Sequence, residues 1–354
     1  MKRSTKYVFL DVHQATTVCA VREESNRVIA QPILPTEATA LTDFFRGMRG
    51  TIHVALEEGT QAQWLSELLR PLVHHVLVCD RRRENRNGNK SDKLDALKGS
   101  ELLRRGGLRA VYHGSAERVT LKELARNYEN VVDQRTRVKQ QLKALYRSRG
   151  IRTAGKAVYC SGEQSQWVSQ LPHRGMQVRA ETLYAQLELL NTLQPTAKAE
   201  LVKDARRDPA WTHLRSIPFL GPVRVALLLA VMQTPWRFRT KRNLWSYAGL
   251  AVVTRSTADY ELKDGKPVRR RRVAMTRGLN QNHNRILKNV FRSAANAATG
   301  RPGSLQDFYH GMIERGMRPE RARVTLARKL AALTLHLWKK GERFDPTKLT
   351  LQAH

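Results

Sequence analysis

Short apolar runs with period-two alternation, separated by tight polar turns, predict a β-sheet at the start of the chain. Helical patterns follow the third and fourth runs, near 36–48 with Thr36 as the expected cap, and around Trp64 to Leu69. Three consecutive strands followed by alternating helices and strands are the order of a mixed-sheet α/β domain, which we expect to end near residue 114. The runs predicted as strands are 7–13, 16–24, 27–34, 51–57 and 74–80.

From about residue 117 the pattern changes to the spacing of long helices. Over 117–147 apolar residues recur at alternating steps of four and three, a heptad rhythm in which Arg135 occupies one of the seam positions. A second helix is expected over 177–193 and should stop before Pro195. The two helices are expected to pair as an antiparallel hairpin or between subunits. A helical linker packed on its own protein fits the pattern equally well.

The last third of the chain predicts a mostly helical domain. A turn at 216–222 precedes a strongly apolar helix and resembles half of a helix-hairpin-helix, with Phe219 where glycine is usual. Two further core-building helices are expected at roughly 279–298 and 319–339. The predicted fold class is α/β plus α. Its divisions are an α/β domain at 1–114, a coiled-coil or linker region at 115–207, a helical domain at 208–345 and a tail at 346–354.

The charge of the chain points to a polyanionic partner. Its 354 residues include 63 Lys+Arg against 31 Asp+Glu, a formal net charge of +32, and neutralising phosphates releases counterions and so gives affinity. The three cysteines, Cys19, Cys79 and Cys160, are scattered and predict neither a disulfide framework nor a zinc site. No signal peptide and no apolar stretch of membrane-spanning length is recognised. We expect a cytoplasmic, nucleoid-associated protein without a membrane partner.

Four carboxylates form the first candidate site. Asp92 and Asp95 share one face of a predicted helix, and Asp11 and Glu57 each end a predicted strand. Such an oxygen-rich pocket suits Mg²⁺ and handles phosphates. For the helical pair alone, a capped first turn favoured by the helix dipole is the better interpretation, and only the set of four shifts the balance. Glu58 is adjacent to Glu57, and alternation allows only one of them to point into the site.

The second candidate site is a serine in an arginine-rich loop. Ser256 follows Arg255 and is a candidate nucleophile, although a Ser-Thr pair that bonds its own backbone is the interpretation that the residues alone favour. The segment 236–242 mixes aromatic and cationic residues as nucleic-acid surfaces do, while Trp236 and Trp245 fit a core equally well. The candidate nucleic-acid-binding residues are Arg237, Arg239, Lys241, Arg242, Arg255, Arg269, Arg270, Arg271 and Arg272.

Several blocks together resemble the DEDD-type insertion-sequence transposases, that is, the insertion-sequence 110 family, whose relatives are the Piv-type DNA invertases. The resemblance covers nearly the whole chain, and the Lys90–Ala96 block is its most specific part. The blocks are Leu10-Asp11, Leu56-Glu57-Glu58-Gly59-Thr60, Lys90–Ala96, Ser216-Ile217-Pro218, Tyr247–Leu250, Thr276-Arg277-Gly278 with Asn280 and Asn284-Arg285, and Gly341–Pro346.

The resemblance implies a RuvC-like, ribonuclease-H-like domain whose catalytic metal ligands for Mg²⁺ or Mn²⁺ are Asp11, Glu57, Asp92 and Asp95. It also implies a coiled coil and a C-terminal transposase domain with a serine nucleophile. The motif position falls on Ser256 or Thr257, and Ser256 is chosen because serine is the family's residue. The block after Glu57 departs from the usual pattern, so Glu58 stays an alternative to Glu57.

The resemblance also implies which reaction the protein catalyses. Such enzymes excise and insert an insertion sequence through a phosphoserine link to DNA, as a multimer (a dimer or tetramer), guided in many members by a structured RNA. Two other functions stay open on the residues: a junction-resolving nuclease that uses the same acids with water as nucleophile, and a non-catalytic nucleic-acid-binding protein whose acids are structural.

Overall fold

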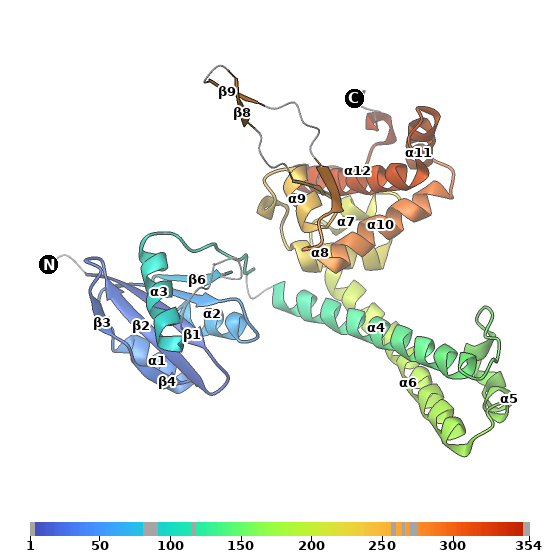
Figure 1. Cartoon of the computed structure of the whole chain (residues 1–354), viewed down its shortest axis with the longest axis horizontal. Helices are drawn as coiled ribbons and strands as arrows, with labels where there is room; N and C mark the ends of the chain where they lie inside the picture. Colours follow the sequence, from blue (N-terminus) through green and yellow to red (C-terminus); the bar gives the residue numbers. More distant parts are fainter. Residues whose placement is uncertain are drawn as a thin grey trace. The chain divides into compact units, whose positions relative to one another are not determined.

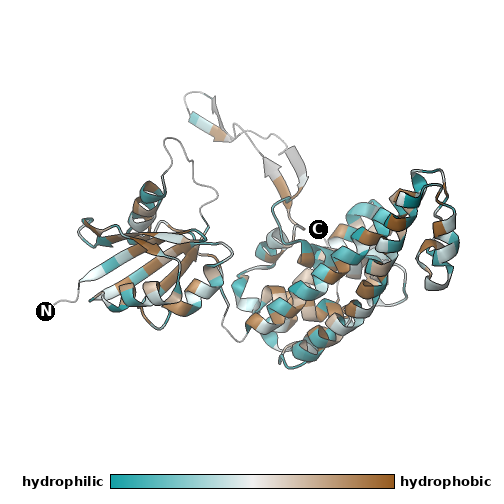
Figure 2. Ribbon diagram, turned by 90° about the horizontal axis from the view of Figure 1, so that it is seen from below, coloured by the Kyte–Doolittle hydropathy of each residue, from teal (hydrophilic) through white to brown (hydrophobic). Residues whose placement is uncertain are grey.

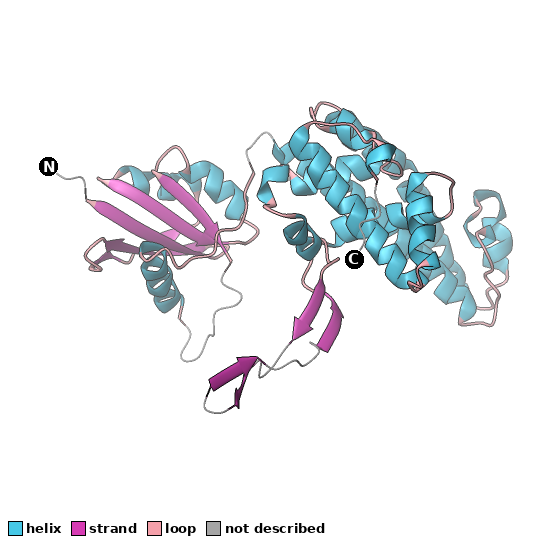
Figure 3. Ribbon diagram, turned by 90° about the horizontal axis from the view of Figure 1, so that it is seen from above, coloured by secondary structure: helices cyan, strands magenta, loops and turns pink. Residues whose placement is uncertain are grey.

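The computed structural model describes residues 4–80, 91–114, 118–255, 260–263, 266–269 and 275–349. The chain divides into two compact units, residues 1–116 and 117–354, and each is described by itself (Figure 1). The first unit is mixed α/β, and the second is mostly helical with a few short strands, as the colours of Figure 3 show. The predicted combination of an N-terminal mixed sheet with a mostly helical remainder is confirmed.

One sheet organises the first unit. Its strand order is β3-β2-β1-β5-β6, and β4 pairs with β2 beside this path. β1 is antiparallel to β2 and parallel to β5, which is parallel to β6. The strand predicted at 27–34 is in fact two short strands, because Pro32 has no amide hydrogen for a continuous ladder. The strands are β1 (Thr5–Val12), β2 (Thr16–Glu23), β3 (Val28–Ala30), β4 (Ile33–Pro35), β5 (Thr51–Glu57) and β6 (His75–Cys79).

Helices cover both faces of the sheet. α1 (Ala38–Arg46) and α2 (Ala62–Leu69) pack on the face of Val8, Leu10, Val54 and Leu56, and α3 (Asp92–Arg104) packs on the face of Phe9, Ala20 and Ala55. Both faces are therefore apolar, and Figure 2 shows hydrophobic residues concentrated along these strands.

The expected cap of α1 is wrong. Glu37 precedes the helix without a side-chain cap, and the Thr36 hydroxyl instead donates to the carbonyl oxygen of His13 at 2.9 Å. Thr36 therefore fastens the turn after β1 rather than the start of the helix.

The close approach of α3 to the sheet depends on Gly99. A Cβ built on Gly99 would lie 2.3 Å from a ring carbon of Phe9, which is fully buried on β1. A buried cation adds a second attachment, because the guanidinium of Arg22 on β2 donates to the Ser100 hydroxyl and to the Leu97 carbonyl oxygen of α3. Together these contacts fix the height and rotation of α3 over the end of β1.

Replacing Gly99 with alanine is expected to destabilise the first unit by roughly 1–3 kcal/mol, because the methyl group overpacks against the Phe9 ring and lifts α3. Denaturant unfolding followed by circular dichroism measures this loss. Gly175→Ala is the matched control, since Gly175 is also helical but a Cβ there meets no atom within 4 Å. A Gly99→Ala protein as stable as the wild type would contradict the packing argument.

Two long helices form a hairpin in the second unit. α4 (Val119–Arg147) and α6 (Arg174–Ala205) run antiparallel, and the hydroxyls of Tyr146 and Tyr184 lie 3.1 Å apart near one end. Arg135, at the predicted seam, donates to the Asn191 side chain at 2.7 Å, and Arg118 pairs with Asp208 near the other end. Of the alternatives left open by the sequence, the two helices pair within one chain.

The predicted stop before Pro195 is wrong, because α6 continues through this proline for ten more residues. Proline removes one helical hydrogen bond, but burial of Ala197, Leu201 and Ala205 holds the following turns in place. The connection between the long helices, which the sequence left unassigned, contains α5 (Gln164–Ser169) and the 3₁₀ turns η2 (Ala157–Tyr159) and η3 (Ser161–Glu163).

The remaining helices build the core of the second unit around α8, which is buried on nearly all sides. Phe219, in the turn before α8, has a left-handed φ of 65°, the conformation for which glycine is usual. The helices are α7 (Trp211–Arg215), α8 (Pro222–Met232), η4 (Pro235–Arg237), α9 (Lys241–Tyr247), α10 (Arg285–Thr299), α11 (Ser304–Glu314), α12 (Pro319–Lys340) and η5 (Pro346–Lys348).

Strands replace the loop that the sequence suggested after residue 251. β7 pairs antiparallel with β10, and β8 pairs antiparallel with β9. As a result, the helix expected from about 279 begins only at Arg285, after β10 has ended. The strands are β7 (Val252–Arg255), β8 (Tyr260–Lys263), β9 (Lys266–Arg269) and β10 (Met275–Leu279).

Candidate functional site

Strand alternation places Asp11 and Glu57 on the face of the sheet that α3 covers. Side chains two residues apart share a face, so Asp11 follows Phe9 and Glu57 follows Ala55, both of which pack in the core beneath α3. β1 and β5 are parallel neighbours in register, with Leu10 opposite Leu56. The two carboxylates therefore leave neighbouring strands at the same edge and on the same face.

The first turn of α3 brings two more carboxylates to this edge. Ser91 caps the helix, since its hydroxyl accepts a hydrogen bond from the Leu94 amide at 3.3 Å, and Asp92 and Asp95 follow in the first turn. The cap and the helix dipole account for the acids locally. The same turn also lies over the end of β1, so a capped first turn is compatible with the predicted shared site.

Asp11 is partly buried, with 18% of its side chain exposed, and its pKa responds to the neighbouring acids. Burial raises the pKa of the Asp11 carboxyl above its usual value, and His13 opposes the shift. The negative charges of Asp92, Glu57 and Asp95 raise it further, in that order. The three other predicted acids thus lie close enough to Asp11 to disfavour its negative charge, a condition that a divalent cation would relieve.

His13 joins the acids, and sequence reasoning missed it. Its Nε2 atom lies 3.3 Å from a carboxylate oxygen of Asp92 and 3.7 Å from one of Asp11. One ligand atom from each of the three residues falls within 4.8 Å of the others, and two ligands of one ion lie about 3–4 Å apart when each is about 2.1 Å from it. The sequence spacing could have identified His13, because it follows Asp11 by two residues and therefore lies on the same side of the chain.

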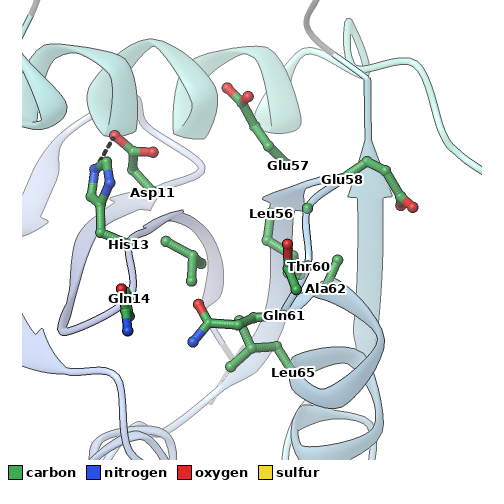
Figure 4. A pocket seen from close by; sticks show the side chains of 12 residues that line it. Asp11, His13, Gln14, Leu56, Glu57, Glu58, Thr60, Gln61, Ala62 and Leu65 are labelled. Carbon is green, nitrogen blue, oxygen red and sulfur yellow. Dashed lines mark ion pairs between the residues drawn. The ribbon is translucent and has the colours of Figure 1, made fainter. Parts of the chain in front are cut away.

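Glu57 and Glu58 point in different directions (Figure 4). Glu57 reaches toward α3, whereas Glu58 turns away and its carboxylate hydrogen-bonds with Nε2 of His113. Both line a cavity of about 620 Å³ between the ends of β1 and β5 and the start of α2, together with Asp11 and His13. Asp92 and Asp95 do not line this cavity, and the side chain of Asp92 is 52% exposed. The acids therefore form an open edge, which suits a large substrate.

The Tyr247–Leu250 block is held by residues that the family resemblance also singled out. The Asn280 side chain donates to the Ser246 carbonyl oxygen at 2.9 Å, and the Asn284 amide donates to the Tyr247 carbonyl oxygen at 2.8 Å. Gly249 has a φ of 65°, and a Cβ there would lie 2.5 Å from the His283 ring. These contacts hold one end of the β7–β10 ladder, where the start of β7 pairs with the end of β10.

Several predicted residues of the second site fall outside the part of the chain that the structure describes: Ser256, Thr257, Arg270, Arg271 and Arg272. Arg255 is the last residue of β7 and Arg269 the last residue of β9.

The candidate nucleic-acid cations in η4, before α9 and in its first turn divide into two groups. The Arg237 guanidinium donates to the Val231 carbonyl oxygen at 2.9 Å and to the Tyr247 hydroxyl at 3.0 Å, so it braces the fold. Arg239, Lys241 and Arg242 are exposed. The two tryptophans differ as well: Trp245 is partly buried and its Nε1 donates to the Arg328 carbonyl oxygen, whereas Trp236 is exposed.

Comparison with known proteins gives two matches along the chain. A DEDD transposase model of the IS110 group, described as Transposase, matches residues 8–148. A second model, described as Transposase IS116/IS110/IS902 family, matches residues 212–310. No curated protein matches the chain.

The two matched stretches contain the features just described. The first includes all four acids and α4, and the second runs from α7 to α11 and includes the β7–β10 segment. Among the described helices, none has the length and hydropathy needed to span a bilayer. The matches imply a DNA-processing enzyme with DNA as a partner, and the chain belongs to the IS110 family of insertion-sequence transposases.

Proposed function

We propose that this transposase cuts and rejoins DNA through a covalent phosphoserine link, with a divalent metal ion held by Asp11, Glu57, Asp92 and Asp95 and with Ser256 as the nucleophile. The observation that carries the proposal is geometric: Asp11 and Glu57 end neighbouring parallel strands, and the first turn of α3, with Asp92 and Asp95, lies at the same edge. The raised pKa of Asp11 is consistent with this arrangement. A cluster of like charges at a strand edge has little value for stability and is typical of sites tuned for chemistry.

The topology supports a RuvC-like assignment of the first unit. Three antiparallel strands adjoin two parallel ones in the order β3-β2-β1-β5-β6, and the acids lie at the ends of β1 and β5 and on a later helix. This is the arrangement expected of a ribonuclease-H-like metal site.

The donor set fits Mg²⁺ or Mn²⁺. Carboxylate oxygens are the ligands that Mg²⁺ prefers, and the imidazole of His13 is a donor that Mn²⁺ accepts more readily. When bound, such an ion polarises the scissile phosphate and neutralises charge that develops on its oxygens. The Nε2 atom of His13 lies near carboxylate oxygens of both Asp11 and Asp92 and is placed to orient them.

The remaining chemistry belongs to the chain. The Ser256 oxygen attacks the phosphorus and gives up its proton, a serine–phosphorus bond forms, and the bond to the 3′-oxygen breaks. The departing oxygen takes up a proton and becomes a 3′-hydroxyl. That hydroxyl then attacks the phosphoserine of a partner strand, which regenerates serine and a phosphodiester. Bond energy is conserved, so no nucleotide cofactor is needed.

The net charge of the chain and the α4–α6 hairpin indicate the partners that this function requires. A net charge of +32 suits DNA together with a structured guide RNA. The long α4–α6 hairpin offers a rigid, coiled-coil-like arm for assembly into a dimer or tetramer. Such a protein would work at the nucleoid.

Covalent capture tests the proposal. The protein, purified with its RNA, is mixed with labelled donor and target DNA and Mg²⁺, and the products are separated on a denaturing gel beside Ser256→Ala and Asp92→Asn. We expect a DNA-linked protein band in the wild type and none in either variant. If DNA is cut without a linked band, and cutting persists in Ser256→Ala, the protein is instead a metal-dependent nuclease. Activity untouched by Asp92→Asn would assign a structural role to the acids.

The neighbouring glutamates provide a matched pair of variants. Glu57→Gln is expected to lower metal-dependent cleavage by about 100-fold or more, because it removes a charged ligand from the cluster. Glu58→Gln should stay within about threefold of the wild type, since the Glu58 carboxylate engages His113 and faces away from α3. Single-turnover cleavage rates measure both. Reversed effects would move the metal ligand to Glu58.

A further inference from the structure

Trp236 is the most exposed large hydrophobic side chain among the described residues, with 71% of its surface open to solvent. It lies in the short turn η4, between the core helix α8 and the start of α9. An indole left in water forgoes the burial that aromatic side chains normally obtain. Pro235 and Phe238 are buried on either side, so the turn itself is well anchored while the ring projects from it.

A cation is fixed beside the ring. The Lys339 ammonium, in the last turn of α12, lies 5.3 Å from the centroid of the Trp236 ring. The same ammonium donates to the carbonyl oxygen of Phe238 at 2.7 Å and to that of Arg239 at 3.4 Å. Lys339 is therefore held by the backbone rather than by an acid, and its charge stays available to an anion.

The surroundings of the ring are basic and open. Arg239, just before α9, and Arg242, in its first turn, are exposed, whereas the ammonium of Lys340 at the end of α12 lies 3.8 Å from a carboxylate oxygen of Glu342. We call Trp236, Lys339, Arg239 and Arg242 the Trp236 platform. An exposed aromatic ring with cations around it is the combination with which proteins hold unpaired bases, the ring stacking on the base and the cations meeting the phosphates.

We propose that the Trp236 platform binds single-stranded nucleic acid by stacking Trp236 on an unpaired base. A duplex offers no free base face, so the contribution of Trp236 is specific to single strands. Neither the ring nor a point charge detects a 2′-hydroxyl, so single-stranded DNA and RNA are bound alike. The inference rests on the proposed function only in that the ligand is a nucleic acid.

Binding of the full-length protein to labelled 15-nucleotide strands in EDTA tests the inference separately from the acid site. Trp236→Ala is expected to weaken binding of single-stranded DNA and RNA by roughly 5- to 150-fold, and duplex binding by less than about twofold. Trp236→Phe keeps a ring and should retain most of the affinity. Leu189→Ala, which trims another exposed apolar side chain on α6 (60% exposed), is the control and should bind as the wild type does.

Fluorescence gives a second measurement. Stacking on a base should quench the indole of Trp236, and the quenching should be lost in Trp236→Phe and absent with an abasic strand. Equal binding of single strands by the wild type and Trp236→Ala would overturn the inference. Equal losses for single strands and duplex would overturn it too, because the ring would then contribute to a surface that does not distinguish unpaired bases.

Discussion

Asp11→Asn is expected to lower metal-dependent cleavage by about 10²–10³-fold and at the same time to make the metal-free protein more stable. The variant removes a partly buried carboxylate of the proposed metal site. It also removes a charge that burial and three neighbouring acids disfavour. A gain in stability combined with a loss of activity separates a functional acid from a structural one, whose removal would lower both.

The stability gain has a defined pH dependence. Because the pKa of Asp11 is raised in the folded protein, the folded state holds its proton more tightly than the unfolded state. Stability then falls as pH rises from the unfolded pKa to the folded pKa, and the full cost is present above the folded value. The advantage of Asp11→Asn should therefore be greatest near neutral pH and shrink on acidification.

Thermal unfolding in EDTA at several pH values, together with cleavage assays in Mg²⁺, measures both effects. Asp43→Asn is the control, since Asp43 is an exposed acid on α1 of the same unit, and it should change neither quantity. An Asp11→Asn protein that cleaves normally, or that melts below the wild type at neutral pH in EDTA, would contradict the interpretation of Asp11.

The sequence predicted the sheet of the first unit because its strands carry the period-two signal of packed faces. That signal also placed Asp11 and Glu57 correctly at strand ends, and the capped turn of Asp92 and Asp95 followed from Ser91. The close packing of α3 on β1 could not be predicted from the sequence. It depends on the absence of a side chain at Gly99, which matters only because Phe9 lies beneath it.

Local rules failed where tertiary contacts outweighed them. Pro195 predicted the end of a helix, but the buried turns beyond it carry α6 onward. The segment after residue 251 is rich in arginine and glycine and predicted a loop, although β7 and β10 pair across about twenty residues of sequence. Long-range pairing of this kind leaves little trace in a short window.

The sequence also could not show which of two residues of the same type, such as two arginines or two tryptophans, is exposed and which is buried. Arg237 and Arg239 are two residues apart in a segment that looked uniformly basic, yet Arg237 bonds to Val231 and Tyr247 while Arg239 is exposed. Trp236 and Trp245 fitted a core equally well, and only Trp245 is partly enclosed. The direction of a side chain within a turn depends on the residues that it contacts in the folded protein, and the sequence alone does not identify them.

The largest effect is expected at the proposed nucleophile, where Ser256→Ala should lower covalent DNA linkage and strand exchange by about 10³-fold or more, because the variant lacks the hydroxyl oxygen that would attack. Thr257→Ala should stay within about threefold of the wild type.

The pair of variants distinguishes the two hydroxyls directly, because both follow β7, whose base Asn280 and Asn284 hold against the Tyr247–Leu250 block. Peptide mapping of the DNA-linked protein measures the site of attachment. Linkage at Thr257, with Ser256→Ala active, would move the nucleophile by one residue. Cleavage by a Ser256→Ala/Thr257→Ala double variant would require water as the nucleophile. In that case the four acids would be sufficient for cutting, and rejoining would need a separate source of energy, because hydrolysis does not conserve the phosphodiester bond energy that strand exchange uses.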